Sequence, residues 1–211
     1  MSEKIFVTGI DTEIGKTIVS AILVEALEAD YWKPIQSGDL HYSDTMKVKE
    51  LVSNSNSRFF EESYRLKTPA SPHYSALLDG VEISMDGIHA PQTSNHLVIE
   101  GAGGLMVPIN EGGDMILDVV KKTATKVVLV SKNYLGSINH TLSAFEVLKS
   151  RGIEIDLLVF NGESNEATEK IIIDVAKPGA VVRIPLLEEV SSQQVRELSI
   201  NHKKQFTNEF S

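Results

Sequence analysis

Apolar residues follow two alternating patterns along this chain. Short, mainly apolar runs predict buried strands at residues 5–8, 31–35, 97–99, 126–130, 155–160 and 180–184. Between them, apolar residues recur every three or four positions, which predicts helices at residues 17–27, 43–51, 73–78, 115–122, 137–148 and 166–176. Because strands alternate with helices and are apolar on both faces, the pattern predicts an α/β fold with a mainly parallel sheet and helices on both faces.

The length of the chain suits one domain. A sequence of 211 residues leaves little room for a second α/β domain, so we expect a single domain over residues 1–211. Residues 205–211 are expected to be frayed at the end of the chain. Residues 58–96 are the least regular part, because prolines interrupt them.

Composition and charge exclude several classes of protein. The formal net charge is -9 without a basic cluster, so a nucleic-acid partner is not expected. The absence of cysteine excludes disulfides, thiolate metal sites and cysteine nucleophiles. No run approaches the about 18 apolar residues that a membrane span needs, and the N-terminus does not resemble a signal peptide. We therefore expect a cytoplasmic protein.

The clearest motif is a phosphate-binding loop at residues 9–17, with the sequence GIDTEIGKT. It follows the first predicted strand and opens the first predicted helix, which is the context that a Walker A loop requires. Backbone N–H groups of such a loop wrap a phosphate, and the helix directs its positive end at the anion. Lys16 would then reach the β- and γ-phosphates, and the Thr17 hydroxyl would bind magnesium.

Carboxylates near the metal are the second requirement of a P-loop enzyme. Glu100 ends the predicted strand at residues 97–99 and is a candidate for this role, with Glu in place of the usual Asp. Asp44 opens a predicted helix, where it reads as a first-turn acid favoured by the helix dipole. The glycines at 101–104 do not form a dinucleotide-binding motif, because Met106 stands where the third glycine is needed.

Six segments, taken in order along the chain, resemble one family. They are GIDTEIGKT at 9–17, YWKPIQSG at 31–38, SD at 43–44, PASPH at 69–73, VIEGAGG at 98–104 and LGSINH at 135–140. Together they resemble the dethiobiotin synthetases, in which the phosphate-binding loop has the same five-residue spacer between Gly9 and Gly15. The resemblance extends from residue 3 to about residue 187, which is nearly the whole chain.

The resemblance implies a P-loop NTPase-like fold and an ATP-dependent cyclo-ligase of biotin biosynthesis. Members of the family join 7,8-diaminononanoate and CO2 to form dethiobiotin, with release of ADP and phosphate. The steps it implies are carbamate formation on one amine, phosphorylation of the carbamate by ATP, and attack by the second amine. ATP and Mg2+ are the expected cofactors, and a homodimer with active sites near the interface is the expected assembly.

Catalytic roles follow from the same resemblance. Lys16 and Lys33 would flank the transferring phosphoryl group and the carbamate, where they would neutralise developing charge. Thr12 and Glu13 would face the substrate from inside the loop. Ser37 would hydrogen-bond the carbamate or the diamine. Without the resemblance, Lys33 could equally be a surface lysine, and Ser37 could equally be a turn residue.

Binding roles are also implied by the resemblance. Magnesium would be held by Thr17, Asp44 and Glu100. The nucleotide would be bound by Glu13, Ile14, Gly15, Lys16, Thr17, Ile18, Asp44, Asn161, Pro185 and Leu187. The diamine would be bound by Ser37, Gly103, Ser137, Ile138 and Asn139, and the 136–139 turn would reach the site from the neighbouring subunit to receive the substrate carboxylate. Without the resemblance, Asn161 is more simply a turn residue before Gly162.

Three other functions fit the sequence less well than this interpretation. A nucleotide-switch ATPase of the partitioning or septum-positioning type would carry a second lysine early in its loop, but the residues after Gly9 are Ile, Asp, Thr and Glu. An amidotransferase would need a Cys nucleophile and a further domain. A purely structural nucleotide-binding module would not need Lys33, Ser37 and Glu100 beside the loop.

Overall fold

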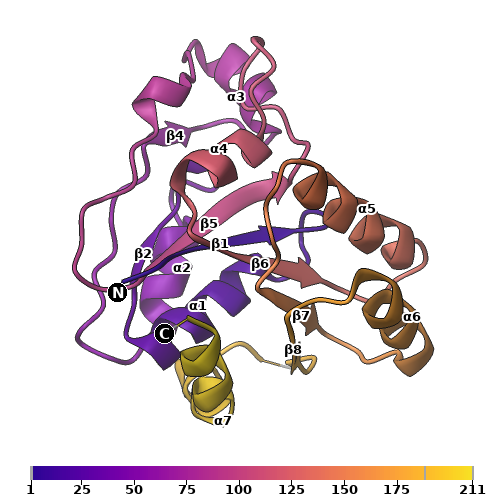
Figure 1. Cartoon of the computed structure of the whole chain (residues 1–211). Helices are drawn as coiled ribbons and strands as arrows, with labels where there is room; N and C mark the ends of the chain where they lie inside the picture. The colour runs from indigo at the N-terminus through magenta and orange to yellow at the C-terminus, as the bar shows by residue number, and fades with distance from the viewer. Residues whose placement is uncertain (1, 188, 211) are drawn as a thin grey trace.

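The computed structural model describes residues 2–187 and 189–210, and its strands and helices alternate along the chain as predicted (Figure 1). The strands are β1 (Lys4–Gly9), β2 (Asp30–Trp32), β3 (Ile35–Ser37), β4 (Tyr64–Leu66), β5 (Leu97–Gly104), β6 (Lys126–Ser131), β7 (Leu157–Asn161) and β8 (Ala180–Ile184). The helices are α1 (Lys16–Leu27), α2 (Asp44–Leu51), α3 (Pro72–Asp79), α4 (Ile116–Thr123), α5 (Ser137–Ser150), α6 (Glu166–Ala176) and α7 (Ser192–Phe210), with a short 3-10 helix at Met85–Gly87.

Six of the strands form one parallel sheet in the order β2-β5-β1-β6-β7-β8. The central strand β1 pairs with β5 on one side and β6 on the other, so that Ile5 lies opposite Val98 and Lys126. Because all the strands point the same way, their carboxyl ends share one edge of the sheet. The chain leaves β1 between β5 and β6, and a crevice at such a position is where ligands bind in open α/β sheets.

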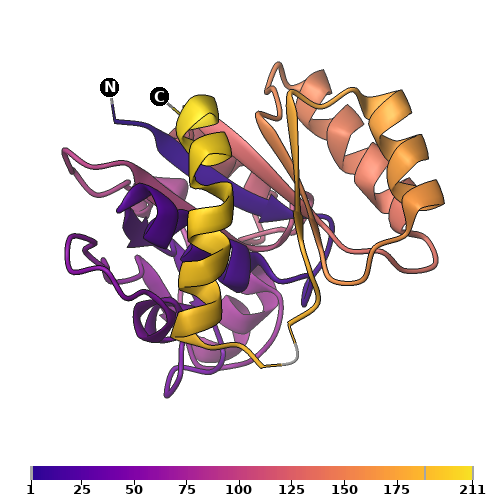
Figure 2. The same ribbon diagram turned by 90° about the horizontal axis from the view of Figure 1, so that it is seen from below.

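Helices cover both faces of the sheet, and each face has its own apolar core. On one face, Val7, Val98 and Val128 pack with residues of α1 and α7, which lie alongside each other (Figure 2). On the other face, Phe6 and Ile99 pack with residues of α4, α5 and α6. Neighbouring strand residues alternate between these faces. The predicted fold class is therefore confirmed.

The strand predicted at residues 31–35 is wrong as a single element. The chain forms β2 and then β3, and β3 leaves the main sheet to pair with β4 in a separate parallel pair. Lys33 and Pro34 lie between them. Since proline has no N–H to donate to a strand ladder, it separates two ladders at a place where the apolar run continues. Lys33 therefore lies at the carboxyl edge of the main sheet.

The prediction that residues 205–211 are frayed is also wrong for the residues of this tail that the structure describes. Helix α7 continues to Phe210, and Phe206 and Phe210 are each 1% exposed. Four residues apart, these rings share one helix face, which packs against the core that contains α1. Ser211 lies outside the described residues.

Candidate active site

The phosphate-binding loop connects β1 to α1 at the carboxyl edge of the sheet. Gly15 is the N-cap of α1 and has a φ of 92°, a left-handed conformation that favours glycine. A Cβ on Gly15 would stand 2.1 Å from Nδ2 of Asn161, which is too close. The same Nδ2 donates a 2.9 Å hydrogen bond to the carbonyl oxygen of Ile14. Asn161, at the end of β7, therefore supports the loop directly.

Lys16 is the first residue of α1, and its ammonium group lies within the loop. Its Nζ donates a 2.8 Å hydrogen bond to the carbonyl oxygen of Asp11, and the residue is 8% exposed. Burial, followed by the charge of Lys33, lowers the pKa of Lys16 from 10.5 to about 8, although nearby carboxylates oppose the shift. A phosphate in the loop would favour the charged form of this lysine.

Lys33 lies between two carboxylates. Its Nζ is 2.8 Å from Oδ2 of Asp44 and 3.2 Å from Oε1 of Glu100, and it donates a 3.3 Å hydrogen bond to the carbonyl oxygen of Gly101. Burial alone would lower the pKa of Lys33, but the charges of Glu100 and Asp44 outweigh burial and raise it. Lys33 is thus a buried cation at the carboxyl edge of the main sheet and not a surface lysine.

Glu100 links the loop to this cation. Its side chain is 1% exposed, and Oε1 accepts a 2.9 Å hydrogen bond from the Thr17 hydroxyl. Oε2 accepts a 2.9 Å hydrogen bond from the hydroxyl of Tyr31, which is fully buried. Burial, with the charge of Glu100, raises the pKa of Tyr31 well above 10.0 and keeps this hydroxyl a donor. Sequence reasoning missed Tyr31, because it lies in an apolar strand where an aromatic ring needs no other explanation.

Asp44 lies in the first turn of α2, as predicted from the sequence, and its carboxylate contacts two lysines. It is the first residue of α2, but the cap is Ser43, whose Oγ accepts from the backbone N–H of Met46. The Asp44 carboxylate contacts Lys33 and also Lys47, at 3.2 Å. Burial would raise the pKa of Asp44, but Lys33 and then Lys47 lower it.

Two residues that the sequence did not single out hold Asp44 in place. The backbone N–H of Asp44 donates to Oε1 of Gln36 at 3.2 Å. The buried carboxylate of Glu62 accepts from the hydroxyls of Ser43 and Thr45, on either side of Asp44, at 3.3 and 2.6 Å. No local sequence pattern marks either residue, because their partners come from distant segments.

Three oxygen-bearing side chains meet at this point, those of Thr17, Asp44 and Glu100. A hydroxyl and two carboxylates are the ligand types that Mg2+ prefers, and Mg2+ commonly takes its remaining ligands from water and substrate phosphates. Among residues 2–187 and 189–210, no group of three or more His, Cys, Asp and Glu side chains is arranged to hold a metal ion. The donor set therefore fits a magnesium ion that is shared with a phosphate.

Residues predicted to face the diamine come from the loop, from β3 and from the end of β5. Ser37 ends β3, and its Oγ is buried without a hydrogen-bond partner among the described residues. Thr12 and Glu13 are exposed, and Glu13 has a φ of 53°. Gly103 has a φ of 70°, and a Cβ there would stand 3.8 Å from Cγ2 of Thr12. A buried polar atom without a partner, such as Oγ of Ser37, is suited to bind a ligand.

A hollow of about 350 Å³ connects the loop to α5. Its lining includes Gly9, Asp11, Gly104, Met106 and His140. The walls combine loop backbone with apolar side chains, which suits a ligand that has a polar end and an aliphatic chain.

The 136–139 turn lies at the start of α5. Gly136 is the N-cap, with a φ of 105°, and Ser137 is fully buried, its Oγ accepting from the backbone N–H of Tyr134 at 3.4 Å. Ile138 and Asn139 are exposed. The turn therefore presents the side chains of Ile138 and Asn139 at the surface.

Residues predicted to contact the base gather at the ends of β7 and β8. Pro185 is exposed and Leu187 is half-buried. A hollow of about 280 Å³ is lined by residues that include Phe160, Gly162, Ile184 and Pro185. Asn161 itself contacts the phosphate-binding loop, so one residue predicted to contact the base lies beside the loop predicted to bind the phosphates.

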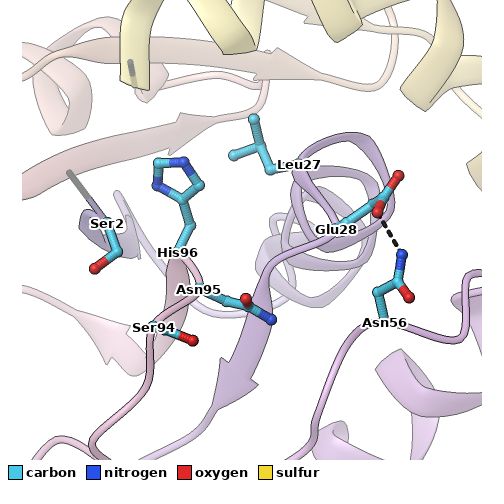
Figure 3. A pocket seen from close by; sticks show the side chains of 7 residues that line it. All are labelled: Ser2, Leu27, Glu28, Asn56, Ser94, Asn95 and His96. Atoms are coloured by element: carbon cyan, nitrogen blue, oxygen red, sulfur yellow. Dashed lines mark hydrogen bonds between the residues drawn. The ribbon is translucent and has the colours of Figure 1, made fainter.

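Another hollow, of about 610 Å³, lies at the opposite edge of the sheet (Figure 3). Its lining includes His96, which precedes β5, and Leu27, which ends α1. Glu28 and Asn56 are hydrogen-bonded across it (Figure 3). None of the candidate catalytic residues lines this hollow.

Solved structures share the fold at low sequence identity. A ParA family ATPase from Chlorobium tepidum TLS superimposes with a TM-score of 0.57 at 14% identity, over 96% of this chain and 99% of that one. A putative plasmid partition protein from Borrelia burgdorferi B31, bound to AMPPNP, gives a TM-score of 0.57 at 9% identity, over 100% and 98% of the chains. At such identities the likeness shows the fold alone.

Sequence comparison identifies the family. A family model described as an AAA domain matches residues 3–194. An ATP-dependent dethiobiotin synthetase from Christiangramia forsetii is 53% identical over 184 residues, which are 87% of this chain and 88% of that protein. One from Brucella ovis is 45% identical over 92% of each chain. The family-model match spans the loop, the Lys33 site and the turn at the start of α5, and with these relatives the chain belongs to the ATP-dependent dethiobiotin synthetase family.

Proposed function

We propose that this protein closes 7,8-diaminononanoate and CO2 into dethiobiotin at the expense of ATP, as a cyclo-ligase of biotin biosynthesis. The observation that carries the proposal is the buried Lys33, which lies beside the phosphate-binding loop and between the two candidate metal ligands Asp44 and Glu100. A simple nucleotide-binding module has no need of a buried cation there. A ligase needs it, because carbamate and phosphate are both anionic.

The chemistry divides a difficult ring closure into easier steps. One amine of the diamine attacks CO2 and loses a proton, which gives a carbamate. A carbamate oxygen attacks the γ-phosphorus of ATP, and ADP leaves. The second amine then attacks the carbonyl carbon of the mixed anhydride and loses a proton, the C–O bond breaks, and phosphate leaves as the cyclic urea forms. Phosphorylation provides a leaving group that a bare carbamate lacks.

Side chains of the site act on charge and position. Lys16 and Lys33 neutralise the charge that develops on the transferring phosphoryl group and the carbamate. Ser37 donates its buried hydroxyl to the carbamate or the diamine, which gives that group the partner it lacks. Thr12 and Glu13 border the reacting end of the substrate.

Magnesium and ATP are held by the groups already described. Thr17, Asp44 and Glu100 would hold Mg2+, which would supply positive charge to the phosphates. The loop and the start of α1 surround the phosphates, and Asn161, Pro185 and Leu187 border the base. The phosphate contacts are made through Glu13, Ile14, Gly15, Lys16, Thr17 and Ile18.

The diamine spans the hollow beside the loop, with its carboxylate at a helix N-terminus. Gly103 borders its chain, and Ser137, Ile138 and Asn139 receive its carboxylate from the neighbouring subunit of a homodimer. Leu135 is 103% exposed and Ile138 is 38% exposed, so the turn presents apolar surface for such a contact. A helix N-terminus suits a carboxylate because its N–H groups and dipole are positive.

The proposed location is the cytoplasm. No helix in the described part of the chain is long and apolar enough to cross a membrane. The absence of cysteine agrees with a reducing compartment.

Turnover tests the proposal directly. The protein would be incubated with Mg-ATP, bicarbonate and 7,8-diaminononanoate, and dethiobiotin would be measured by mass spectrometry. We expect product from the wild type, none from Lys16→Ala, and wild-type amounts from Lys170→Ala, which changes an exposed lysine on α6. ATP hydrolysis that ignores the diamine, without dethiobiotin, would favour the switch ATPase instead.

A further inference from the structure

Glu169, on α6, is a buried carboxylate outside the catalytic groups described above. It is 2% exposed, whereas its neighbour on the same helix, Glu166, is exposed. An acidic residue in the first turn of a helix often does no more than interact favourably with the helix dipole. That explanation does not account for Glu169, because Asn165 already caps α6 through a 3.0 Å hydrogen bond from the backbone N–H of Thr168.

The carboxylate of Glu169 joins two connections and one strand of the sheet. Oε1 accepts from Nδ2 of Asn133 at 2.9 Å, from Oγ of Ser164 at 3.0 Å and from the backbone N–H of Asn165 at 3.1 Å. Oε2 accepts from Nε of Arg183 at 2.6 Å. These partners belong to the connection after β6, the connection after β7, and β8, which are neighbours in the sheet (Figure 1).

Each of these three segments is adjacent along the chain to a proposed binding segment. Asn133 comes three residues before Gly136, where the turn that is proposed to receive the substrate carboxylate begins. Ser164 follows Asn161, which supports the phosphate-binding loop. Arg183 comes two residues before Pro185, at the proposed base contact. Nδ2 of Asn133 also donates to the carbonyl oxygen of Glu163 at 2.9 Å, which strengthens the link between the first two connections.

The electrostatics favour a fixed, ionised carboxylate. Burial would raise the pKa of Glu169, but its hydrogen bonds, with the bond from Arg183 first among them, lower it. Charge-assisted hydrogen bonds are stronger and more directional than neutral ones. Arg183 is itself placed over the ring of Phe160, with Cζ 5.9 Å from the ring centroid.

We propose that Glu169 is a positioning residue that sets the substrate turn and the nucleotide loop relative to each other through Asn133 and Arg183. The inference rests on the proposed function, since it concerns the same two binding segments. Its consequence is that one side chain, which also lines the hollow at the proposed base contact, governs the affinity for both ligands.

The test compares Glu169→Gln with Glu166→Gln in the full-length protein. Glutamine keeps the size of the side chain but places an amide N–H₂ against a partner that is also a donor. We expect Glu169→Gln to raise KM for ATP and for the diamine by about 5- to 30-fold with kcat changed less, because the loss of one or two such hydrogen bonds has this effect. Glu166→Gln should leave both constants unchanged.

Two further variants separate positioning from simple stability. Arg183→Gln, at a side chain that is 54% exposed, should raise KM for ATP more than KM for the diamine. Asn133→Ala should do the reverse. If both variants raise the two constants equally, or if Glu169→Gln lowers the unfolding temperature and leaves both constants unchanged, the inference is overturned.

Nucleotide affinity separates the inference from the proposed function. Calorimetric titration with Mg-ADP needs no turnover, and Glu169→Gln should bind Mg-ADP about 5- to 30-fold more weakly than the wild type. A wild type that makes no dethiobiotin overturns the proposed function, whereas an unchanged Mg-ADP affinity in Glu169→Gln overturns the inference.

Discussion

At the scale of single residues, the buried hydroxyl of Tyr31 offers a sharp test of how the site is held. Tyr31→Phe removes one hydrogen bond to the buried carboxylate of Glu100. We expect a loss of about 2 kcal/mol in the free energy of unfolding, because a buried charged group loses one of its partners. Urea unfolding at neutral pH, followed by fluorescence, measures this difference.

The matched control for this change is Tyr42→Phe. Its hydroxyl also donates to a glutamate, Glu50, at 2.6 Å, but Tyr42 is 44% exposed. Water replaces the lost partner there, so no measurable change is expected. Equal losses in the two variants would show that burial of Glu100 does not determine the strength of the contact.

Residues that carry local chemistry were predictable, and residues that position them were not. Lys16 and Thr17 follow from one motif, since a strand, a glycine-containing loop and a helix define their place. Tyr31 and Glu62 act on residues far along the chain, and neither lies in a pattern that marks a function. Lys33 and Ser37 were assigned by resemblance alone, because a lysine or a serine near a turn has several ordinary explanations.

At the scale of elements, α7 contributes more to the stability of the fold than its polar sequence indicates. Phe206 lies in the core that α7 shares with α1 and is 1% exposed. We expect Phe206→Ala to cost about 3–5 kcal/mol in the free energy of unfolding, from lost apolar contact and the cavity left behind. Ile200→Ala, on the exposed side of the same helix, should cost less than about 0.5 kcal/mol. Similar costs for the two variants would mean that α7 is only loosely attached.

Asp30, at the start of β2, connects elements through a pH-dependent contact. Its carboxylate accepts hydrogen bonds from Arg58, Thr93 and Asn95. Burial would raise the pKa of Asp30, but the bonds from Thr93 and Arg58, followed by that from Asn95, outweigh burial and lower it below 3.8. The ionised form is therefore favoured in the folded state. Its stabilisation is complete above the ordinary pKa and is lost as the pH falls through the lowered one.

Asp30→Asn should therefore be less stable than the wild type by a constant amount between pH 7 and about pH 5, by about 2 kcal/mol. The difference should shrink below about pH 4, where the wild-type carboxyl begins to take up a proton. Urea unfolding across this pH series measures it, with the exposed Asp86→Asn as the control. A difference that stays constant into acid would show that the charge of Asp30 is not what stabilises the contact.

The elements themselves were predictable to the extent that apolar periodicity determines them. Strands buried on both faces, such as β6 and β7, stand out because each contains four consecutive apolar residues. The break between β2 and β3 was missed, because apolar residues continue across Pro34 and only the pairing partners change. The packing of α7 onto the core was also not predicted, because it depends on two phenylalanines among polar residues.

At the scale of the whole molecule, the proposed homodimer would place segments of two chains at each site. The exposed turn at 136–139 and the fully exposed Leu135 lie at the start of α5, while Lys16 lies within the phosphate-binding loop. In a symmetric dimer, a turn of one subunit can meet the loop of the other twice, once for each site. Each site would then need residues from both chains.

Mixing two inactive variants tests this arrangement. Lys16→Ala lacks the phosphate contact, and Asn139→Asp places a negative charge where the substrate carboxylate is received, so each alone should be inactive at low diamine concentration. After the variants are unfolded and refolded together, half of the dimers are mixed, and each mixed dimer holds one site built from the two intact halves. Dethiobiotin formation should return to roughly a quarter of the wild-type rate. If each site were built within one chain, every site would contain a defect and the mixture would remain inactive.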